Sequence, residues 1–304
     1  MALKPDRRQT ETMRPDARWA FARYRAIAHR LPQPARPWPK HSYRILDLDY
    51  VLKRYDGFIL DAFGVLNIGE GVLEQALKRV ATMRALGKKV MVLTNGASAP
   101  RAEALAKYRG WGFDFADTEV IASRDLAGAA LAGRGGLWAG IVPERAGFAD
   151  LPGDVRALDD DLLGRADGFL FLGSQDWTDA KQAALVAALK ARPRPVICAN
   201  PDIVAPREDG FTWEPGHWAH QLPVPVEYHG KPFAGAFDAA LAAMGLPPER
   251  VAMVGDTLHT DILGGHAAGC ATVLITGHGF FKGVDPDSFI EATGIVPTFI
   301  ADET

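Results

Sequence analysis

Two short polar segments follow apolar runs in the first third of the chain, and both carry groups suited to phosphate or metal chemistry. The apolar run at 58–60 ends at Asp61, and a glycine-containing turn follows. A carboxylate at a strand end can act as a nucleophile or a metal ligand, although such an Asp also serves as an ordinary turn residue. A second run ends in Thr94-Asn95-Gly96, whose hydroxyl and amides could bind phosphate oxygens or simply close a turn.

Three further charged residues stand at corresponding places in the last third of the chain. Lys231 precedes a predicted helix, where an ammonium could hold a dianion or could merely be solvated. Asp256 and Asp261 straddle a predicted strand-to-helix turn. Two carboxylates so spaced suit a hard divalent cation, whereas Asp261 taken alone could cap the helix. With Asp61 and Thr94, these residues supply the nucleophile, hydroxyl, cation and acidic pair that one phosphate site requires.

Apolar runs of strand length alternate with helical patterns near both ends of the chain. This alternation predicts an α/β fold, with a doubly wound, Rossmann-like core whose parallel strands are joined by right-handed crossovers. Ligands of such sheets bind at the carboxyl ends of the strands, where the polar segments above fall. The expected strands are 57–60, 89–93, 251–254 and 271–275, and the expected helices are 73–86, 101–108 and 261–268.

The middle of the chain has strand and helix patterns of its own, at 168–172, 178–191 and 195–199. These are more than one crossover needs, so we expect an inserted α/β cap domain. The predicted domains are an N-terminal basic extension at 1–40, a core at 41–118 and 227–304, and a cap at 119–226.

Charge is distributed unevenly along the chain. The 34 Lys and Arg and 37 Asp and Glu give a formal net charge of −3, yet residues 1–50 hold 11 basic and 5 acidic side chains. The acidic remainder argues for a small-molecule substrate and against nucleic acid as a partner. Residues 1–17 predict a disordered arm. Residues 18–31 predict a short Arg-rich helix. We expect it to pack on the body or on a partner subunit rather than to serve as a transit peptide or an anion-binding arm.

The chain offers no signal for membrane insertion or secretion. No apolar segment reaches the roughly 18 to 20 residues that a membrane span needs, and the N-terminus lacks a secretory signal. Cys198 and Cys270 lie in apolar runs without metal-binding or redox spacing, which predicts two reduced, buried thiols. We therefore expect a cytoplasmic protein with no membrane partner.

Across about residues 55 to 280 the chain resembles the haloacid dehalogenase superfamily of hydrolases. Four ordered motifs carry the resemblance: Asp61-Ala62-Phe63-Gly64, Thr94-Asn95-Gly96, Lys231-Pro232, and Gly255-Asp256 with Asp261. Within the superfamily it looks most like the NagD-like, 4-nitrophenyl phosphatase-like branch (class IIA), whose cap lies between the second and third motifs. The interval of 137 residues from Thr94 to Lys231 fits such a cap, and Asn200-Pro201-Asp202 matches a signature common in that branch.

The resemblance implies a Mg²⁺-dependent phosphatase that acts on a small phosphorylated metabolite through an aspartyl-phosphate. Asp61 would be the nucleophile, Thr94 would bind the transferring phosphoryl group, and Lys231 would stabilise its charge. The implied phosphate-binding residues are Thr94, Asn95, Gly96 and Lys231. The implied metal ligands are Asp61, the main-chain carbonyl of Phe63, Asp256 and Asp261.

Phe63 departs from the family pattern, in which phosphatases usually carry an Asp there to protonate the leaving group and then activate water. A phenyl ring cannot transfer a proton, so a role typically worth about 10²- to 10⁴-fold in rate is missing. A phosphatase with Phe63 could be slow, could act on good leaving groups, or could borrow His259 or His229 as the base. For either histidine, a structural or surface role is favoured over that of a base.

Two other functions stay open on the same residues. One is a phosphate- and Mg²⁺-binding regulatory module that has lost turnover. The other is a 2-haloacid dehalogenase-like hydrolase, because Asp61-Ala62-Phe63-Gly64 resembles the Asp-Ala-Tyr-Gly start of those enzymes. The retained acidic pair and the position of the cap argue against the dehalogenase.

Two features of the cap have alternative interpretations. Trp213 and Trp218 could stack a planar group or could pack between the domains. The apolar helix expected at 180–189 could contribute to a homodimer, as caps of this branch often do, or could simply cover the cap sheet.

Overall fold

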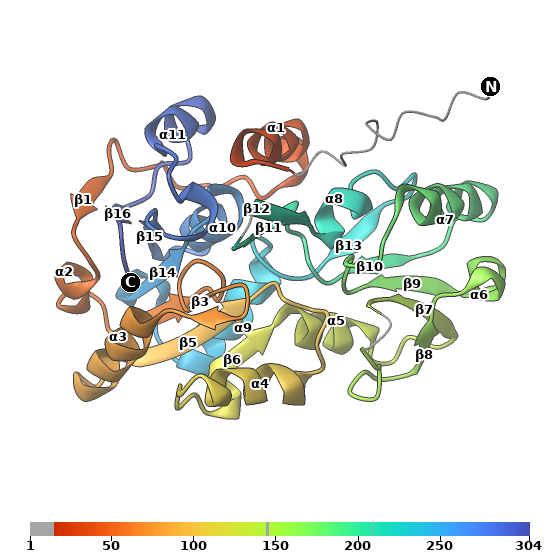
Figure 1. Ribbon diagram of the computed structural model, residues 1–304, viewed down its shortest axis with the longest axis horizontal. Helices are drawn as coiled ribbons and strands as arrows, with labels where there is room; N and C mark the ends of the chain where they lie inside the picture. Colours follow the sequence, from red (N-terminus) through yellow and green to blue (C-terminus); the bar gives the residue numbers. More distant parts are fainter. Residues whose placement is uncertain (1–14, 144–145, 209) are drawn as a thin grey trace, which may run out of the picture.

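The computed structural model describes residues 15–143, 146–208 and 210–304. A seven-stranded sheet, in which every neighbouring pair of strands is parallel, occupies the left half of Figure 1. Its order is β1 (Tyr43–Ile45), β16 (Phe299–Ala301), β15 (Ala271–Ile275), β14 (Val251–Gly255), β2 (Gly57–Leu60), β5 (Lys89–Thr94) and β6 (Val120–Ala122). The predicted parallel α/β core is thus confirmed.

Helices cover both faces of this sheet because successive strand residues point to opposite sides. Phe58 and Leu60 of β2 pack on the same side as α3 (Glu74–Ala85) and α4 (Arg101–Gly110). Ile59 between them packs with α9 (Ala234–Met244) on the other side. The central strands are therefore buried on both faces, and their carboxyl ends form the edge where a site can be built.

A second, five-stranded sheet lies in the right half of Figure 1, and its neighbouring strands are again parallel. Its order is β13 (Val226–Tyr228), β10 (Val196–Cys198), β9 (Gly168–Phe171), β7 (Leu137–Ile141) and β8 (Asp154–Ala157). One face is covered by α6 (Asp160–Arg165), α7 (Asp179–Ala191) and α8 (Pro215–Ala219). The other face packs against α5 (Ser123–Leu131). The covering position of α7 favours its role as a packing helix of the cap.

Further helices, turns and strands complete the described secondary structure. They are α1 (Ala17–Ile27), α2 (Asp49–Leu52), α10 (Leu263–Ala267), α11 (Asp287–Thr293), β3 (Asn67–Ile68), β4 (Gly71–Val72), β11 (Val204–Arg207), β12 (Gly210–Trp213), a π-helical turn (Leu258–Ile262), and 3₁₀ turns at 28–30, 117–119, 248–250 and 279–281. Within the described ranges, no helix combines the length and the apolar character that a membrane span requires.

Two predicted boundaries differ from those in the structure. The helix expected from Asp261 starts at Leu258 as a π-helical turn, because the amides of Asp261 and Ile262 both donate to the Thr257 carbonyl. The arm predicted at 1–17 falls mostly outside the described residues, and Ala17 already begins α1, whose N-terminus is capped by Asp16. The packing of α1 on the body, one of the two placements expected for the N-terminal helix, is observed.

The chain passes from the first sheet to the second after β6, and it returns to the first sheet after β13. β6 at 120–122 belongs to the first sheet, and β13 at 226–228 belongs to the second. Sheet membership therefore changes a few residues later than the predicted cap limits of 119 and 226. Short edge strands carry little pattern of their own, which explains the offset. The division into domains at the numbers given above stays a prediction.

Candidate active site

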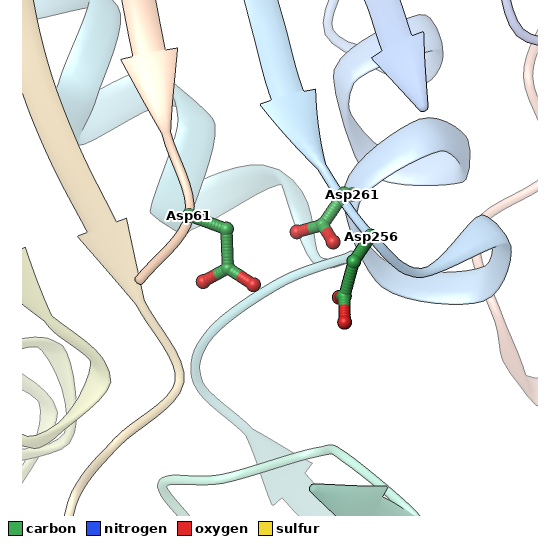
Figure 2. A group of neighbouring side chains, drawn as sticks. All are labelled: Asp61, Asp256 and Asp261. Atoms are coloured by element: carbon green, nitrogen blue, oxygen red, sulfur yellow. The ribbon is translucent and has the colours of Figure 1, made fainter. Parts of the chain in front are cut away.

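Three carboxylates meet at the carboxyl ends of β2 and β14. Leu60 and Val254 are paired across these strands, so Asp61 and Asp256, which follow close behind, lie at one edge of the sheet. Asp261 reaches the same place from the π-helical turn. The three residues offer oxygens that all lie within 4.8 Å of one another. Figure 2 shows the carboxylate of Asp61 turned toward that of Asp261, with Asp256 beside them.

Two glycines permit this close approach. Gly64 has a φ of 76°, in the left-handed region that favours glycine, and a Cβ there would collide with the side chain of Asp256. A Cβ at Gly255 would collide with the carboxyl group of Asp261. Any larger residue at either position would displace an acid from the cluster.

Lys231 supplies the cation of the cluster and is only 1% exposed. Its Nζ lies 2.6 Å from Asp61 Oδ1 and 2.7 Å from Asp261 Oδ1. Asp256 instead accepts hydrogen bonds from the Thr257 hydroxyl and a backbone amide. When all three acids are ionised, one ammonium leaves two negative charges uncompensated in a buried place. That charge and the all-oxygen donor set fit a divalent metal ion.

Burial governs the ionisation of these groups. The pKa of Asp61 is raised to about 7, because burial, reinforced by the charge of Asp261, outweighs the opposing effect of Lys231. Burial and the two neighbouring acids also raise the pKa of Asp256. Burial by itself would lower the pKa of Lys231, but Asp261 and Asp61 outweigh it and raise that pKa. The metal-free cluster therefore binds protons at neutral pH.

The segment after β5 stands next to Asp61, because β5 and β2 are neighbours in the sheet. Thr94 is buried, and its hydroxyl accepts a hydrogen bond of 3.1 Å from the Gly96 amide. The side chain of Asn95 holds the backbone of Lys231, accepting from its amide at 2.7 Å and donating to its carbonyl at 2.9 Å. No local pattern signals this contact, because the two residues stand 136 positions apart.

A loop of the cap reaches the same turn. Asp202 Oδ1 accepts a hydrogen bond of 2.9 Å from Asn95 Nδ2. Asn200 in turn accepts from the Asp202 amide at 3.0 Å and donates to Glu214 at 3.0 Å. Burial raises the pKa of both Asp202 and Glu214. The Asn-Pro-Asp segment therefore joins the cap to the turn that carries Thr94.

Between the core and the cap lies a cleft of about 310 Å³. Its lining includes Asp61, Phe63, Thr94, Lys107, Tyr108 and Asp256 from the core and Leu172, Ser174, Asp202, Arg207 and Glu214 from the cap. The ring of Phe63 lies near two cations, with Arg207 Cζ 4.9 Å and Lys107 Nζ 5.7 Å from the ring centroid. Neither cation could be predicted from the sequence, because Lys107 in α4 and Arg207 in β11 belong to no motif.

The two histidines considered as substitute bases are held elsewhere. His259 is buried and stacks on Tyr24, with ring centroids 4.6 Å apart, and burial lowers its pKa to about 3. His229 Nε2 lies 2.8 Å from Glu227. Neither histidine belongs to the described lining of the cleft. This placement favours a structural role for both.

Trp213 and Trp218 contribute to packing. The ring centroids of Trp213 and Trp19 lie 6.3 Å apart, and the Trp213 ring also stacks on His217. Trp218 is 6% exposed and belongs to the apolar core of the cap. Neither belongs to the described lining of the cleft. Of the two interpretations of these tryptophans, the contacts favour packing between and within domains.

Comparisons with known proteins agree with this geometry. A family model described as haloacid dehalogenase-like hydrolase matches residues 58–140, and a HAD-hydrolase-like model matches residues 228–302. The two matches together span more than half of the chain. They contain Asp61, Thr94, Lys231, Asp256 and Asp261, so both halves of the candidate site fall within them.

Three similar proteins match this chain over nearly their whole length. The acid sugar phosphatase of Staphylococcus aureus (strain MRSA252) is 23% identical over 263 residues, which cover 82% of this chain and 95% of the relative. A structure from Cytophaga hutchinsonii ATCC 33406, described as a "possible sugar phosphatase", has a TM-score of 0.75 and 26% identity. The match covers 86% of this chain and 98% of that structure. NagD from E. coli K-12 has the same fold, with a TM-score of 0.62 and 22% identity. The match covers 82% of this chain and 96% of NagD. The chain belongs to the haloacid dehalogenase-like hydrolases and has the fold of their NagD-like branch.

Proposed function

We propose that this protein is a Mg²⁺-dependent phosphatase acting on a small phosphorylated metabolite. The observation that carries the proposal is the buried cluster in which Lys231 bridges Asp61 and Asp261 beside Asp256, at the wall of the cleft. A carboxylate nucleophile, a buried ammonium and a divalent-cation site in one cleft are what phosphoryl transfer requires. The sugar phosphatases among the relatives support the same reaction class.

The proposed reaction has two steps, and Asp61 takes part in both. Lys231 and the Ala62 amide both bind Asp61 Oδ1, which leaves Oδ2 for attack on phosphorus. The bond from phosphorus to the leaving group breaks as the bond to Oδ2 forms. Water then attacks phosphorus, releases inorganic phosphate and restores the carboxylate. Lys231 and Thr94, with the backbone amides of Asn95 and Gly96, would bind the phosphate oxygens throughout.

The proposed ligands of Mg²⁺ are Asp61, Asp256, Asp261 and the main-chain carbonyl of Phe63. The bound cation would neutralise negative charge on the phosphate oxygens. The cluster suits this role because its acids are buried and exceed the available positive charge. The cleft closed by the cap would keep bulk water from the site.

Hydrolysis of 4-nitrophenyl phosphate tests the proposal, since nitrophenolate leaves without needing a proton. We expect turnover with MgCl₂ and its loss in EDTA, restored by added Mg²⁺. Binding of Mg²⁺ and inorganic phosphate without any turnover would instead identify the regulatory module. Chloride release from a 2-haloacid without metal would identify the dehalogenase.

Replacing Phe63 with Asp should increase turnover of an alkyl phosphate by about 10- to 100-fold, because the new carboxyl group can protonate the alkoxide. Turnover of 4-nitrophenyl phosphate should increase less, since its leaving group needs no proton. The measurement is kcat for ethyl phosphate and 4-nitrophenyl phosphate in Mg²⁺ with the purified variant and wild type.

The matched control for this gain is Phe63→Asn, which has the size of Asp but no acid. Like Phe63→Asp, it also removes the ring that Arg207 and Lys107 contact, so the comparison separates the effect of losing the ring from that of gaining the proton donor. Equal kcat for ethyl phosphate in wild type and Phe63→Asp would show that another group already supplies the proton.

Mg²⁺ should stabilise the protein more at pH 8 than at pH 6. The folded-state pKa of Asp61, about 7, is raised above the value of an unfolded chain. The stability of the metal-free protein is therefore highest below about pH 4 for this group, and is lost as pH rises toward 7. Mg²⁺ must displace these protons, so its affinity increases across the same range.

Thermal unfolding with MgCl₂ and with EDTA at the two pH values measures this difference. Calorimetry in two buffers of different ionisation enthalpy should detect proton release on Mg²⁺ binding at pH 6. Asp238→Asn, an exposed change on α9, serves as the control for altered net charge. An equal Mg²⁺-induced shift of Tm at pH 6 and pH 8 would contradict the protonated state assigned to the cluster.

We also propose a cytoplasmic location, which Cys198 and Cys270 support because both are free and buried. The homodimer expected from the resemblance stays a prediction.

A further inference from the structure

The helix α1 lies where the core and the cap meet. Figure 1 shows it between α11 of the core and α8 of the cap, above the hairpin of β11 and β12. Phe21 packs edge-on against Phe289 of α11, with centroids 4.6 Å apart. On the cap side, the ring centroids of Trp19 and His217 of α8 lie 5.2 Å apart. An N-terminal element outside the catalytic motifs therefore contacts both parts that enclose the cleft.

Tyr24 makes the central contacts of this helix and is only 1% exposed. Its hydroxyl accepts a hydrogen bond of 3.1 Å from the backbone amide of Ile203, in the cap. Its ring lies almost parallel to that of His259, at 5° and 4.6 Å between centroids. Tyr24 and Ile203 share one apolar cluster with Leu258 and Ile262 of the π-helical turn. One side chain thus joins a cap loop to a core turn.

Both segments that Tyr24 contacts lead directly to the candidate active site. Ile203 follows Asp202, whose carboxylate accepts from Asn95, and Asn95 holds the backbone amide of Lys231. His259 precedes Asp261 by two residues in the same π-helical turn. Lys231 and Asp261 are themselves paired at 2.7 Å. The contacts form a closed ring that runs from Tyr24 through the cap loop to Lys231 and back through Asp261.

We propose that Tyr24 is a positioning residue, which holds the 200–203 loop of the cap over the Asn95 turn and thereby maintains the placement of Lys231 against Asp61 and Asp261. The proposal rests on the phosphatase function proposed above. Its physical basis is that the Ile203 amide is buried and Tyr24 is its acceptor. Without that acceptor, the buried amide is unpaired, and a movement of the loop that gives it another partner lowers the free energy of the protein.

Tyr24→Phe tests this role, because it removes the hydroxyl and keeps the ring that stacks on His259. We expect kcat for 4-nitrophenyl phosphate in Mg²⁺ to fall about tenfold, with KM changed less than about twofold, since the loss acts on alignment rather than on ground-state binding. Hydrogen exchange should become at least about threefold faster at the amide of Ile203 and also at the amide of Lys231.

The matched control is Tyr55→Phe, the same change on the partly buried Tyr55 that packs against the core cluster. It should leave kcat and the exchange of both amides unchanged. A purely packing role for Tyr24 would lower Tm or speed exchange at Ile203 alone, with kcat and the Lys231 amide unaffected, and would overturn the proposal. Wild-type protein without turnover would refute the phosphatase, and the exchange of the Lys231 amide would still decide the positioning role.

Discussion

Asp61→Asn should abolish Mg²⁺-dependent hydrolysis of 4-nitrophenyl phosphate, with kcat reduced by at least about 10³-fold. The amide is a poor nucleophile and cannot form the aspartyl-phosphate. It also removes one of three carboxylates from the cluster that would hold Mg²⁺. Steady-state kinetics with and without MgCl₂ measures the loss.

The fold should tolerate this substitution. Asp61 is buried next to Lys231, and its raised pKa shows that its charge is held at a cost to stability. The neutral amide has nearly the same shape, so we expect Tm of the metal-free variant to be equal to or above that of wild type at pH 8. Asp238→Asn, exposed on α9, should leave kcat unchanged. Turnover of Asp61→Asn near the wild-type value would exclude Asp61 as the nucleophile.

Lys231→Met should lower kcat by about 10²- to 10³-fold, because a preorganised charge that stabilises developing negative charge is worth that much in a water-excluded site. Methionine keeps most of the side-chain volume but leaves Asp61 and Asp261 without their shared cation. Removing one partner of a buried ion pair typically costs about 3–5 kcal/mol of stability. Kinetics below the melting temperature and denaturant unfolding at pH 8 measure the two effects separately.

Protonation provides a check on this explanation. Lys231 opposes the upward shift of the Asp61 pKa, so its removal should move that pKa higher and make the stability loss smaller at pH 6 than at pH 8. Lys53→Met, an exposed change on the surface, should alter neither kcat nor stability. A stability loss in Lys231→Met that is the same at both pH values would contradict the ion-pair account.

Much of the core could be predicted because its strands are buried on both faces. Continuous apolar runs at 57–60, 89–93 and 271–275 have few other stable arrangements, and the observed strands match them within one residue. The short strands β1, β6, β8 and β13 lie at or next to sheet edges and were not predicted. Edge strands bury less, so their sequences are less constrained.

The sequence by itself determined the chemical types at the strand ends. In a parallel sheet, the carboxyl ends of neighbouring strands share one edge. Asp61 directly follows β2, Thr94 ends β5 and Asp256 directly follows β14, so the pairing of β2 with β5 and β14 brings the three residues together. The sequence also shows directly that position 63 is Phe and therefore offers no carboxyl group.

Only the tertiary structure decided which other side chains serve the site. The contacts of Asn95 with Lys231, of Asp202 with Asn95, and of Tyr24 with Ile203 join segments more than 100 residues apart in the chain. Hydrogen bonds of this kind depend on side-chain direction and on the docking of the cap, neither of which follows from local periodicity. Local sequence reports which face of an element is apolar, whereas long-range pairing depends on how separate elements pack.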